Sequence, residues 1–393
     1  MQAKEDTTAD PIVTPVVPQE WHFDIGPGEP AAGCIGISPD SLYTPEYGYG
    51  FLPGGEVYGR DRSGMLDSGQ AELVSHVQTS FCILLGAVFA LDVPDGYYQV
   101  KLTVGDLLAA THTVIRFDSS RLLLPPIYTQ AGQLIEMLCT VAVRSGQLRL
   151  SFGGRAPRLN HLQITAVPDT LKLVLAGDST VTDQPADGYP YAGWGQLLPA
   201  RFRHDVCVDN HAVSGRSSMS FIQEGRLDRI REVLHAGDFL FIQFGHNDEK
   251  TDAARHTDPF TTYKQYLTEY INAARDKQAI PVLLTPVSRR SFDNEGRLAD
   301  THGDYLIAMR ELADEQQVPL IDLAERTREL LEQLGPEASK ELFVWLHPGE
   351  YMNFPAGSQD NTHFQEYGAN RVADLVIQGI RELNLQPLTM YLR

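Results

Sequence analysis

The sequence predicts two consecutive domains, an all-β sandwich followed by an α/β domain whose parallel sheet is covered by helices on both faces. The chain has 393 residues, well over the roughly 150 of a typical single domain. Up to about residue 167, short apolar or alternating runs are separated by turn formers. After Pro168, short fully apolar runs alternate with amphipathic helical patterns. We therefore expect the domain boundary near residues 167 to 170.

The first segment, residues 1–20, mixes charged residues with Pro11, Pro15 and Pro18 and contains no apolar run. Such a composition cannot offset the entropy cost of ordering, so we expect a flexible leader. The segment lacks the apolar centre of a signal peptide, and no later run approaches the roughly 18 apolar residues of a membrane span. As written, the sequence predicts a cytoplasmic protein, whereas a trimmed N-terminus would point to secretion.

Composition excludes several partners. Hydrophobic residues make up 42% and charged residues 21%, which is ordinary for a globular protein. The net charge of −19 opposes binding to phosphate backbones and anionic lipid, so we expect no nucleic-acid partner and no membrane partner. The cysteines form no CxxC pair, which predicts buried free thiols and no structural zinc site. They are Cys34, Cys82, Cys139 and Cys207.

The predicted β-sandwich domain spans residues 21–167. Its apolar or alternating runs are separated by turn signals such as Pro94-Asp95-Gly96 and Ser145-Gly146, which are typical of hairpins. We expect roughly eight strands in a sandwich. The clearest runs are 87–93, 97–104, 113–117, 134–143, 147–152 and 161–166.

The predicted α/β domain spans residues 168–393. Its short strands are fully apolar, as expected for strands that are buried on both faces. Amphipathic patterns between them predict the covering helices. The expected strands are 171–176, 239–244, 280–284 and 319–321, and the expected helices are 191–202, 227–234, 261–275, 303–316 and 364–383.

Ser179 directly follows the first predicted strand of this domain, in the sequence Gly177-Asp178-Ser179-Thr180. In open α/β sheets, ligands bind at the carboxyl ends of the strands. Gly177 permits the tight turn that would expose the serine there. Ser179 is therefore a candidate nucleophile, although Asp178 and Ser179 could equally cap a following helix.

Asp360 and His363 stand three residues apart where the last predicted helix opens. This spacing lets a carboxylate and an imidazole meet across one turn. Asp360 could then hold one ring nitrogen of His363, leaving the other to take a proton from Ser179. The alternative is a helix cap beside a surface histidine.

A serine nucleophile also needs donors for the oxygen that becomes negative during attack. Asn247 follows the predicted strand 239–244 in the sequence Gly245-His246-Asn247-Asp248 and can offer its side-chain amide. Gly215, at the end of an earlier strand, allows close approach of its backbone N–H. One such donor is worth about 2.7 to 4 kcal/mol of barrier, so two or three of them decide the rate.

These residues together resemble the SGNH, or GDSL, hydrolase superfamily, over about residues 171–385. The resemblance implies a three-layer αβα sandwich, flavodoxin-like, with five parallel strands. It implies Ser179 as nucleophile, His363 as base and Asp360 as the group that orients it. It also implies an oxyanion hole made by the backbone amides of Ser179 and Gly215 and the side chain of Asn247. The matching blocks are Gly177-Asp178-Ser179, Gly215, Gly245-His246-Asn247-Asp248 and Asp360-x-x-His363.

Within the superfamily, the sequence between the blocks resembles rhamnogalacturonan acetylesterases, which implies removal of acetyl groups from pectic sugars. The first domain resembles the galactose-binding-like β-sandwich, or jelly roll, that precedes some of these enzymes, through residues 23–28 and 47–51. The segments that carry the enzyme resemblance are 177–181, 188–189, 193–196, 212–218, 243–248, 359–363 and 368–369.

We therefore expect a carbohydrate O-acetylesterase, a serine hydrolase acting on short acetylated rhamnogalacturonan oligosaccharides. The alternatives are an esterase for another acylated substrate, such as acetylxylan, and a non-catalytic carbohydrate-binding protein. An acyl-transfer triad needs no cofactor, and the histidine spacings match no zinc pattern, so no cofactor and no metal are expected. Candidate substrate contacts are Trp194, His246 and Trp345, although large aromatic residues more often anchor the core.

Four tyrosines of the first domain have two open interpretations. Aromatic rings with a hydroxyl group suit both carbohydrate binding and contacts between domains. The side chains could therefore form a carbohydrate-binding face or pack the two domains together. They are Tyr43, Tyr47, Tyr49 and Tyr58.

Overall fold

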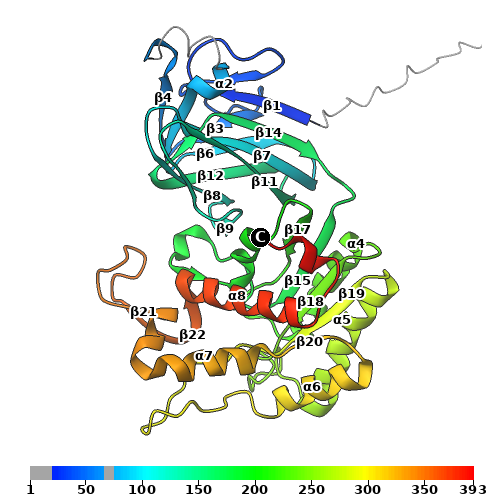
Figure 1. The fold of residues 1–393 in the computed structure, drawn as a ribbon. Coiled ribbons are helices and arrows are strands. Elements are labelled where there is room, and N and C mark those ends of the chain that lie inside the picture. The colour runs from blue at the N-terminus through cyan, green and yellow to red at the C-terminus, as the bar shows by residue number, and fades with distance from the viewer. Residues whose placement is uncertain (1–19, 66–74) are drawn as a thin grey trace, which may run out of the picture.

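The structure, a computed structural model, describes residues 20–65 and 75–393. A β-rich part ends at residue 166 and an α/β part begins at residue 171, and Figure 1 shows the first above the second. The predicted leader, residues 1–20, lies outside the described residues except for Glu20, which begins strand β1. None of the helices in the described part combines the length and the apolar composition that a membrane span requires.

The β-rich part contains two large sheets and one small sheet. The large sheets have the strand orders β11-β7-β14-β1-β2 and β10-β8-β12-β6-β3, with β9 beside β8, and the small sheet has the order β13-β5-β4. Strand β8 alternates buried and partly buried residues along its whole length, as a strand with one core face must. Buried side chains from both large sheets form one hydrophobic cluster, which confirms the predicted β sandwich.

The β-rich part has more strands than the sequence predicts. The six predicted runs correspond to β6, β7, β8, β11, β12 and β14, whereas the shorter strands carry too few residues to show a periodic pattern. The strands are β1 (Glu20–Ile25), β2 (Ile35–Ile37), β3 (Tyr49–Phe51), β4 (Glu56–Asp61), β5 (Ser80–Leu85), β6 (Val88–Asp92), β7 (Gly96–Asp106), β8 (Thr111–Phe117), β9 (Arg121–Leu122), β10 (Ile127–Thr129), β11 (Gln133–Val143), β12 (Gln147–Ala156), β13 (Arg158–Leu159) and β14 (His161–Ala166), with the helices η1 (Ser63–Met65) and α2 (His76–Thr79).

The α/β part is built on a five-stranded parallel sheet with the order β17-β15-β18-β19-β20. In chain order this is the 2-1-3-4-5 arrangement of flavodoxin-like folds, as predicted. Its switch point lies beside β15, so the carboxyl end of β15 is the expected ligand site. The strands are β15 (Leu171–Gly177), β17 (Val206–Asn210), β18 (Phe239–Gln243), β19 (Ile280–Leu284) and β20 (Leu320–Ile321).

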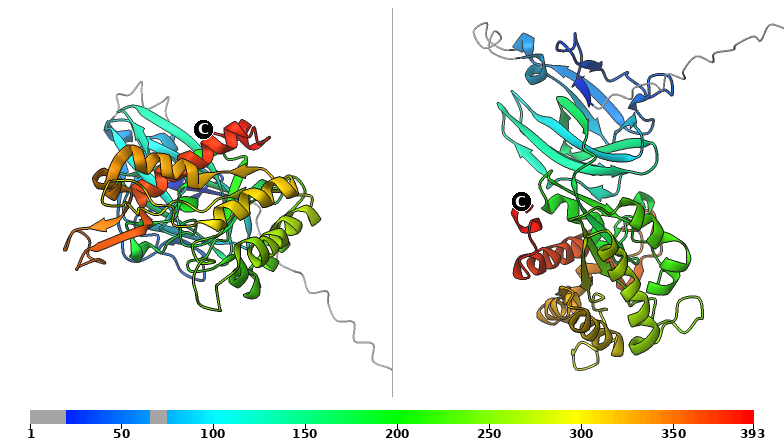
Figure 2. Two further views of the ribbon diagram at one scale, coloured as in Figure 1. Left: turned by 90° about the horizontal axis from the view of Figure 1, so that it is seen from below. Right: turned by 90° about the vertical axis from the view of Figure 1, so that its right-hand side faces the viewer.

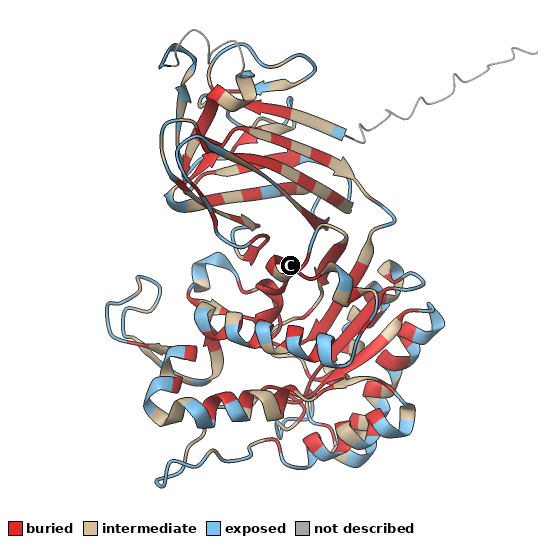
Figure 3. Cartoon of the chain, viewed as in Figure 1, coloured by how far each residue is buried: buried red, intermediate tan, exposed pale blue. Residues whose placement is uncertain are grey.

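Helices cover both faces of this sheet, and Figure 3 shows their buried sides turned inward. One face packs against α3 (Ser218–Gln223), α4 (Arg226–Val233), α5 (Lys264–Asp276) and α6 (Asp304–Gln316). The other face packs against α7 (Leu323–Ala338) and α8 (Glu366–Glu382). Helix α7 was not predicted. The short helices are η2 (Ala186–Gly188), η3 (Trp194–Gln196), η4 (Leu198–Arg201), η5 (Pro259–Tyr263), η6 (Ser339–Leu342) and η7 (Leu388–Tyr391).

The predicted helix over residues 191–202 is wrong. The segment forms the short strand β16 (Tyr191–Ala192) followed by the turns η3 and η4. Its glycines serve close packing, because a Cβ on Gly193 would lie 2.2 Å from the carbonyl oxygen of Thr182. The backbone therefore lies directly against the turn that follows β15.

Within the part of the chain that the structure describes, three ion pairs join the β sandwich to the α/β part. Strand β11 packs against β17, and Leu122 from β9 enters the hydrophobic cluster of the α/β part. The right-hand view of Figure 2 shows this junction from the side. In each ion pair the arginine comes from the β sandwich and the acid from the α/β part. The pairs are Arg116 with Glu366, Arg121 with Asp183 and Arg144 with Asp209.

The four tyrosines that had two open interpretations make contacts within the β sandwich. The hydroxyl of Tyr43 donates to Asp92, and that of Tyr58 donates to Glu56. Tyr49 packs on Phe23 in the core and is also paired with Tyr47. None of these contacts reaches the α/β part, so they give no support to the interdomain role.

The cysteines behave as predicted in all but one position. All four are free, and three of them are buried. Burial raises the pKa of the Cys82 and Cys139 thiols to about 12, so these thiols stay protonated. Cys34 is only partly buried.

Candidate active site

The turn after β15 presents Ser179 at the switch point of the sheet. A Cβ on Gly177 would lie 2.6 Å from the Val181 side chain, so glycine permits the close turn there. Asp178 Oδ1 accepts hydrogen bonds from the backbone N–H and the hydroxyl of Thr180, at 2.9 and 2.8 Å. The next helical segment, η2, begins only at Ala186, so Asp178 and Ser179 hold a turn and do not cap a helix.

Asp360 and His363 lie in strand β22 (Ser358–Gln365) and not at the start of a helix. Strand β22 pairs with β16 and with β21 (Phe343–Leu346) in a small antiparallel sheet. Gln359 faces Trp345, and Phe364 faces Phe343, so the residues between Gln359 and Phe364 form an irregular bulge. The expectation that Asp360 and His363 open the last helix is therefore wrong, because pairing with β21 extends this segment.

The bulge brings the carboxylate and the imidazole together. Asp360 Oδ1 accepts the backbone N–H groups of Thr362 and His363, at 2.7 and 2.9 Å. Asp360 Oδ2 lies 2.7 Å from His363 Nδ1. Burial raises the pKa of Asp360, but the hydrogen bond and charge of His363 and the two backbone donors outweigh it, so the pKa lies below its ordinary value. Asp360 is therefore a carboxylate that holds the ring.

Ser179 completes this row of side chains. Its Oγ lies 3.0 Å from His363 Nε2, although the two residues are 184 positions apart in the sequence. The ring of Tyr191 meets His363 edge to face, with centroids 4.9 Å apart. Serine, histidine and aspartate are thus within hydrogen-bonding reach in the order that a nucleophile, a base and an orienting group require.

Gly215 and Asn247 lie on loops beside this serine. Gly215 has a φ of +79°, a left-handed conformation that favours glycine. The side-chain amide of Asn247 donates to the backbone oxygen of Arg216, at 3.1 Å, and so joins the two loops. The backbone N–H of Val213 donates to the oxygen of Gly177, which ties the Gly215 loop to the turn that carries Ser179.

Asp248 also holds these two loops together, through hydrogen bonds to its buried carboxyl group. Its carboxyl group is buried and accepts bonds from the backbone and hydroxyl of Ser218 and from Thr257. Burial raises the pKa of Asp248 to about 7, against the hydrogen bonds that lower it. Because Ser218 begins α3, Asp248 positions the loop that contains Gly215. The sequence reasoning did not assign this role.

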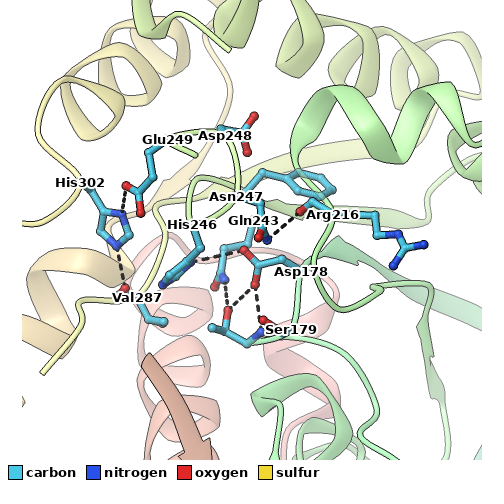
Figure 4. Close-up of polar contacts among 12 residues, drawn as sticks. Asp178, Ser179, Arg216, Gln243, His246, Asn247, Asp248, Glu249, Val287 and His302 are labelled. Atoms are coloured by element: carbon cyan, nitrogen blue, oxygen red, sulfur yellow. Dashed lines mark hydrogen bonds and ion pairs between the residues drawn. The ribbon is translucent and has the colours of Figure 1, made fainter. Parts of the chain in front are cut away.

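A buried polar network lies behind Ser179, as Figure 4 shows. Asp178 Oδ2 lies 3.3 Å from His246 Nδ1, and the ring of His246 meets that of His302 with centroids 4.7 Å apart. His302 in turn contacts Glu249 at 3.1 Å and the backbone oxygen of Val287 at 2.9 Å. The network supports the turn that carries Ser179.

Two of the predicted substrate contacts lie in the interior. His246 is 3% exposed and Trp194 is 1% exposed, and the indole N–H of Trp194 donates to Gln243 at 3.0 Å. Because both rings are buried, a sugar cannot contact either of them. Both residues therefore support the structure of the site. Their sequence positions beside the motifs could not distinguish these roles, because burial depends on the tertiary structure.

Trp345 lies at the surface, beside the strand that carries Asp360. Its indole N–H donates to Asn361 at 2.9 Å, and the cations of Arg290 and Lys340 each lie 4.8 Å from its ring. It lines a cavity of about 760 Å³ together with Gln359. Trp345 is thus placed where a ligand can reach it.

Two further residues at the site were not predicted. Tyr191 was assigned to a helix, which concealed its contact with His363. Gln184 donates from Nε2 to the backbone oxygen of Ser179 at 2.8 Å. Among residues 20–65 and 75–393, no group of three His, Cys, Asp or Glu side chains has the arrangement of metal ligands.

Because His246 is buried, we expect the folded protein to become less stable in acid. Burial lowers its pKa to about 4, although Asp178 favours the charged ring. Between about pH 6.5 and 4 the unfolded chain takes up a proton at this position and the folded chain does not, so the free energy of unfolding falls as the pH falls. The full effect is about 3 kcal/mol. Urea unfolding between pH 7 and 4 should show a shallower fall in His246→Gln, and an equal fall would contradict this.

Comparison with known proteins gives two family matches. Residues 175–353 match the GDSL-like Lipase/Acylhydrolase family. Residues 21–117 match the family described as Beta-agarase/YXIM esterase-like, galactose-binding domain-like. The two matches fall on the α/β part and on the β sandwich respectively.

Two individual proteins are similar to this chain over different shares of its length. The rhamnogalacturonan acetylesterase RhgT of Bacillus subtilis is 51% identical over 215 residues, which are 55% of this chain and 91% of that protein. The uncharacterized esterase YxiM of the same organism is 26% identical over 376 residues, 93% of this chain and 91% of that protein. The crystal structure of YxiM covers 93% of this chain and 99% of its own, with a TM-score of 0.50 and 25% identity.

Proposed function

The chain belongs to the GDSL-like lipase/acylhydrolase family, and we propose that it is a carbohydrate O-acetylesterase whose catalytic residues are Ser179, His363 and Asp360. The observation that carries this proposal is the row of contacts from Ser179 Oγ to His363 Nε2, at 3.0 Å, and from His363 Nδ1 to Asp360 Oδ2, at 2.7 Å. A serine hydrolase needs this arrangement to make a hydroxyl group nucleophilic.

The first chemical step is attack on the acetyl ester. Asp360 accepts the Nδ1–H of His363, so Nε2 has a free lone pair that faces Ser179. As the Ser179 oxygen attacks the carbonyl carbon, its proton passes to Nε2. The carbonyl oxygen takes the electron pair of its double bond and becomes an oxyanion.

Three donors surround the position of that oxyanion in our proposal. They are the backbone N–H groups of Ser179 and Gly215 and the side-chain amide of Asn247. One N–H of that amide donates to Arg216, and an amide nitrogen carries a second N–H for the substrate. Removing one donor of this kind costs about 2.7 to 4 kcal/mol of barrier.

The intermediate then collapses and the enzyme is regenerated. The ester C–O bond breaks, and the sugar oxygen leaves with the proton held on His363 Nε2. A water molecule then gives a proton to Nε2 and attacks the acetyl group on Ser179. The bond between the acetyl carbon and the serine oxygen then breaks, the serine oxygen takes back the proton from Nε2, and acetic acid leaves and ionises to acetate in solution.

The substrate we propose is an acetylated rhamnogalacturonan oligosaccharide. The support is the 51% identity to a protein named rhamnogalacturonan acetylesterase, over nearly all of that protein. The net charge of −19 disfavours long anionic polymers and favours short oligosaccharides. We further propose residues 168–393 as the catalytic domain, residues 21–167 as a galactose-binding-like domain, and Trp345 as a substrate contact.

Acetate release from defined substrates tests this function. We expect faster release from acetylated rhamnogalacturonan oligosaccharides than from acetylated xylan, because the relatives that are 51% and 44% identical are named for the former. Equal or faster release from acetylated xylan would reject the substrate. A serine-directed phosphonate addresses the alternative of a non-catalytic binding protein, since it should label Ser179 in the folded enzyme. Absence of labelling would contradict the catalytic role.

A further inference from the structure

A groove at the junction of the two parts carries residues from both. Its volume is about 130 Å³, and one wall is the end of β8 and the turn that leads to β9, which Figure 1 shows facing the α/β part. The opposite wall follows the turn that carries Ser179, together with the start of α8. The lining residues that matter for its chemistry are Arg116, Gln184, Tyr189, Tyr191 and Glu366.

Two residues that line the groove also contact the candidate active site. Tyr191 lines it and also meets the ring of His363, with centroids 4.9 Å apart. Burial raises the pKa of the Tyr191 hydroxyl, so this group stays protonated and can donate a hydrogen bond. Gln184, another lining residue, donates to the backbone oxygen of Ser179 at 2.8 Å. Residues that line the groove therefore contact both Ser179 and His363.

The groove has the chemistry of a sugar site. Tyr189, which also lines it, is 48% exposed and offers an aromatic surface for the apolar face of a sugar ring. Arg116 and Glu366 form a half-buried ion pair, with both carboxylate oxygens near one guanidinium nitrogen. Such a pair is neutral overall and offers a donor and an acceptor to sugar hydroxyls. A few polar groups beside aromatic walls are typical of small-ligand sites.

We propose that this groove binds the sugar residue next to the acetylated one, so that the β sandwich contributes Arg116 directly to substrate recognition. The proposal rests on the proposed function, and it extends that function from the catalytic domain to the domain before it. It also gives the Arg116–Glu366 ion pair of the junction a role, because both of its members line the groove.

Two variants test this subsite from its two walls, Tyr189→Ala and Arg116→Met. The readout is kcat/KM for an acetylated rhamnogalacturonan oligosaccharide divided by kcat/KM for 4-nitrophenyl acetate, which is too small to occupy both the groove and the nucleophile. We expect each variant to lower this ratio about tenfold, mainly through KM for the oligosaccharide, as lost stacking or charged hydrogen bonds do.

Two control variants separate recognition from domain packing. Tyr128→Ala removes another exposed tyrosine, which pairs with the opposite end of β8. Arg144→Met removes a different interdomain ion pair, outside the groove. Both should keep the wild-type ratio.

An unchanged ratio in Tyr189→Ala and Arg116→Met, or an equal fall in Arg144→Met, would overturn the subsite. Wild-type enzyme that released no acetate from the oligosaccharide would overturn the proposed function and this inference with it.

Discussion

Replacing Ser179 by alanine is expected to lower kcat for ester hydrolysis by about 10⁴- to 10⁶-fold. Alanine removes the Oγ that lies 3.0 Å from His363 Nε2, so no acetyl-enzyme can form. The proposed oxyanion donors and the proposed substrate contact remain, and we expect them to leave a small residual rate. Initial rates with 4-nitrophenyl acetate and with the acetylated oligosaccharide should both show this loss.

The loss must come from chemistry and not from unfolding. Ser179 is 7% exposed and loses one oxygen atom in this variant, so the thermal unfolding midpoint should stay close to that of the wild type. Ser145→Ala is a matched control, because Ser145 lies in an exposed turn of the β sandwich. It should keep full activity. A Ser179→Ala enzyme that retained more than a few per cent of wild-type kcat would refute the assignment of the nucleophile.

The parallel sheet was predictable from the sequence because strands buried on both faces must be almost wholly apolar. Residues 171–176 and 239–244 show this directly, and β15 and β18 form there. The helix expected over 191–202 did not form, because its glycines pack on the turn after β15. Helix α7 was missed although Leu323, Thr327 and Leu331 repeat every four residues on one face.

Three members of the candidate site could be predicted from the sequence, but their local structure could not. The order of Ser179, Asp360 and His363 and the short motifs around them point to the three side chains that the structure brings together. The bulge that joins Asp360 to His363 depends on pairing between β22 and β21, which no local pattern reveals. The interdomain groove was beyond prediction for the same reason, since its walls come from distant parts of the chain.

Replacing Asp360 by asparagine is expected to lower kcat by about 10³- to 10⁴-fold without unfolding the protein. The Oδ1 of asparagine can still accept the two backbone N–H groups that hold the bulge. Its NH₂ group, however, cannot accept the Nδ1–H of His363. The ring is then stabilised in the other tautomer, in which Nε2 carries the proton and cannot take one from Ser179. Rates with 4-nitrophenyl acetate and the rate of phosphonate labelling at Ser179 should fall together.

The chain offers a matched control for this variant at Asp300. Its Oδ1 accepts the backbone N–H groups of His302 and Gly303, at 2.9 and 3.0 Å, in a turn like that of Asp360. The ring of His302 contacts Glu249 instead, so Asp300→Asn changes the same kind of turn without touching the tautomer of His363. Asp300→Asn should keep the wild-type rate. If Asp360→Asn retained more than about a tenth of wild-type kcat, His363 would not depend on this carboxylate for its tautomer, and the role of Asp360 would have to be reassigned.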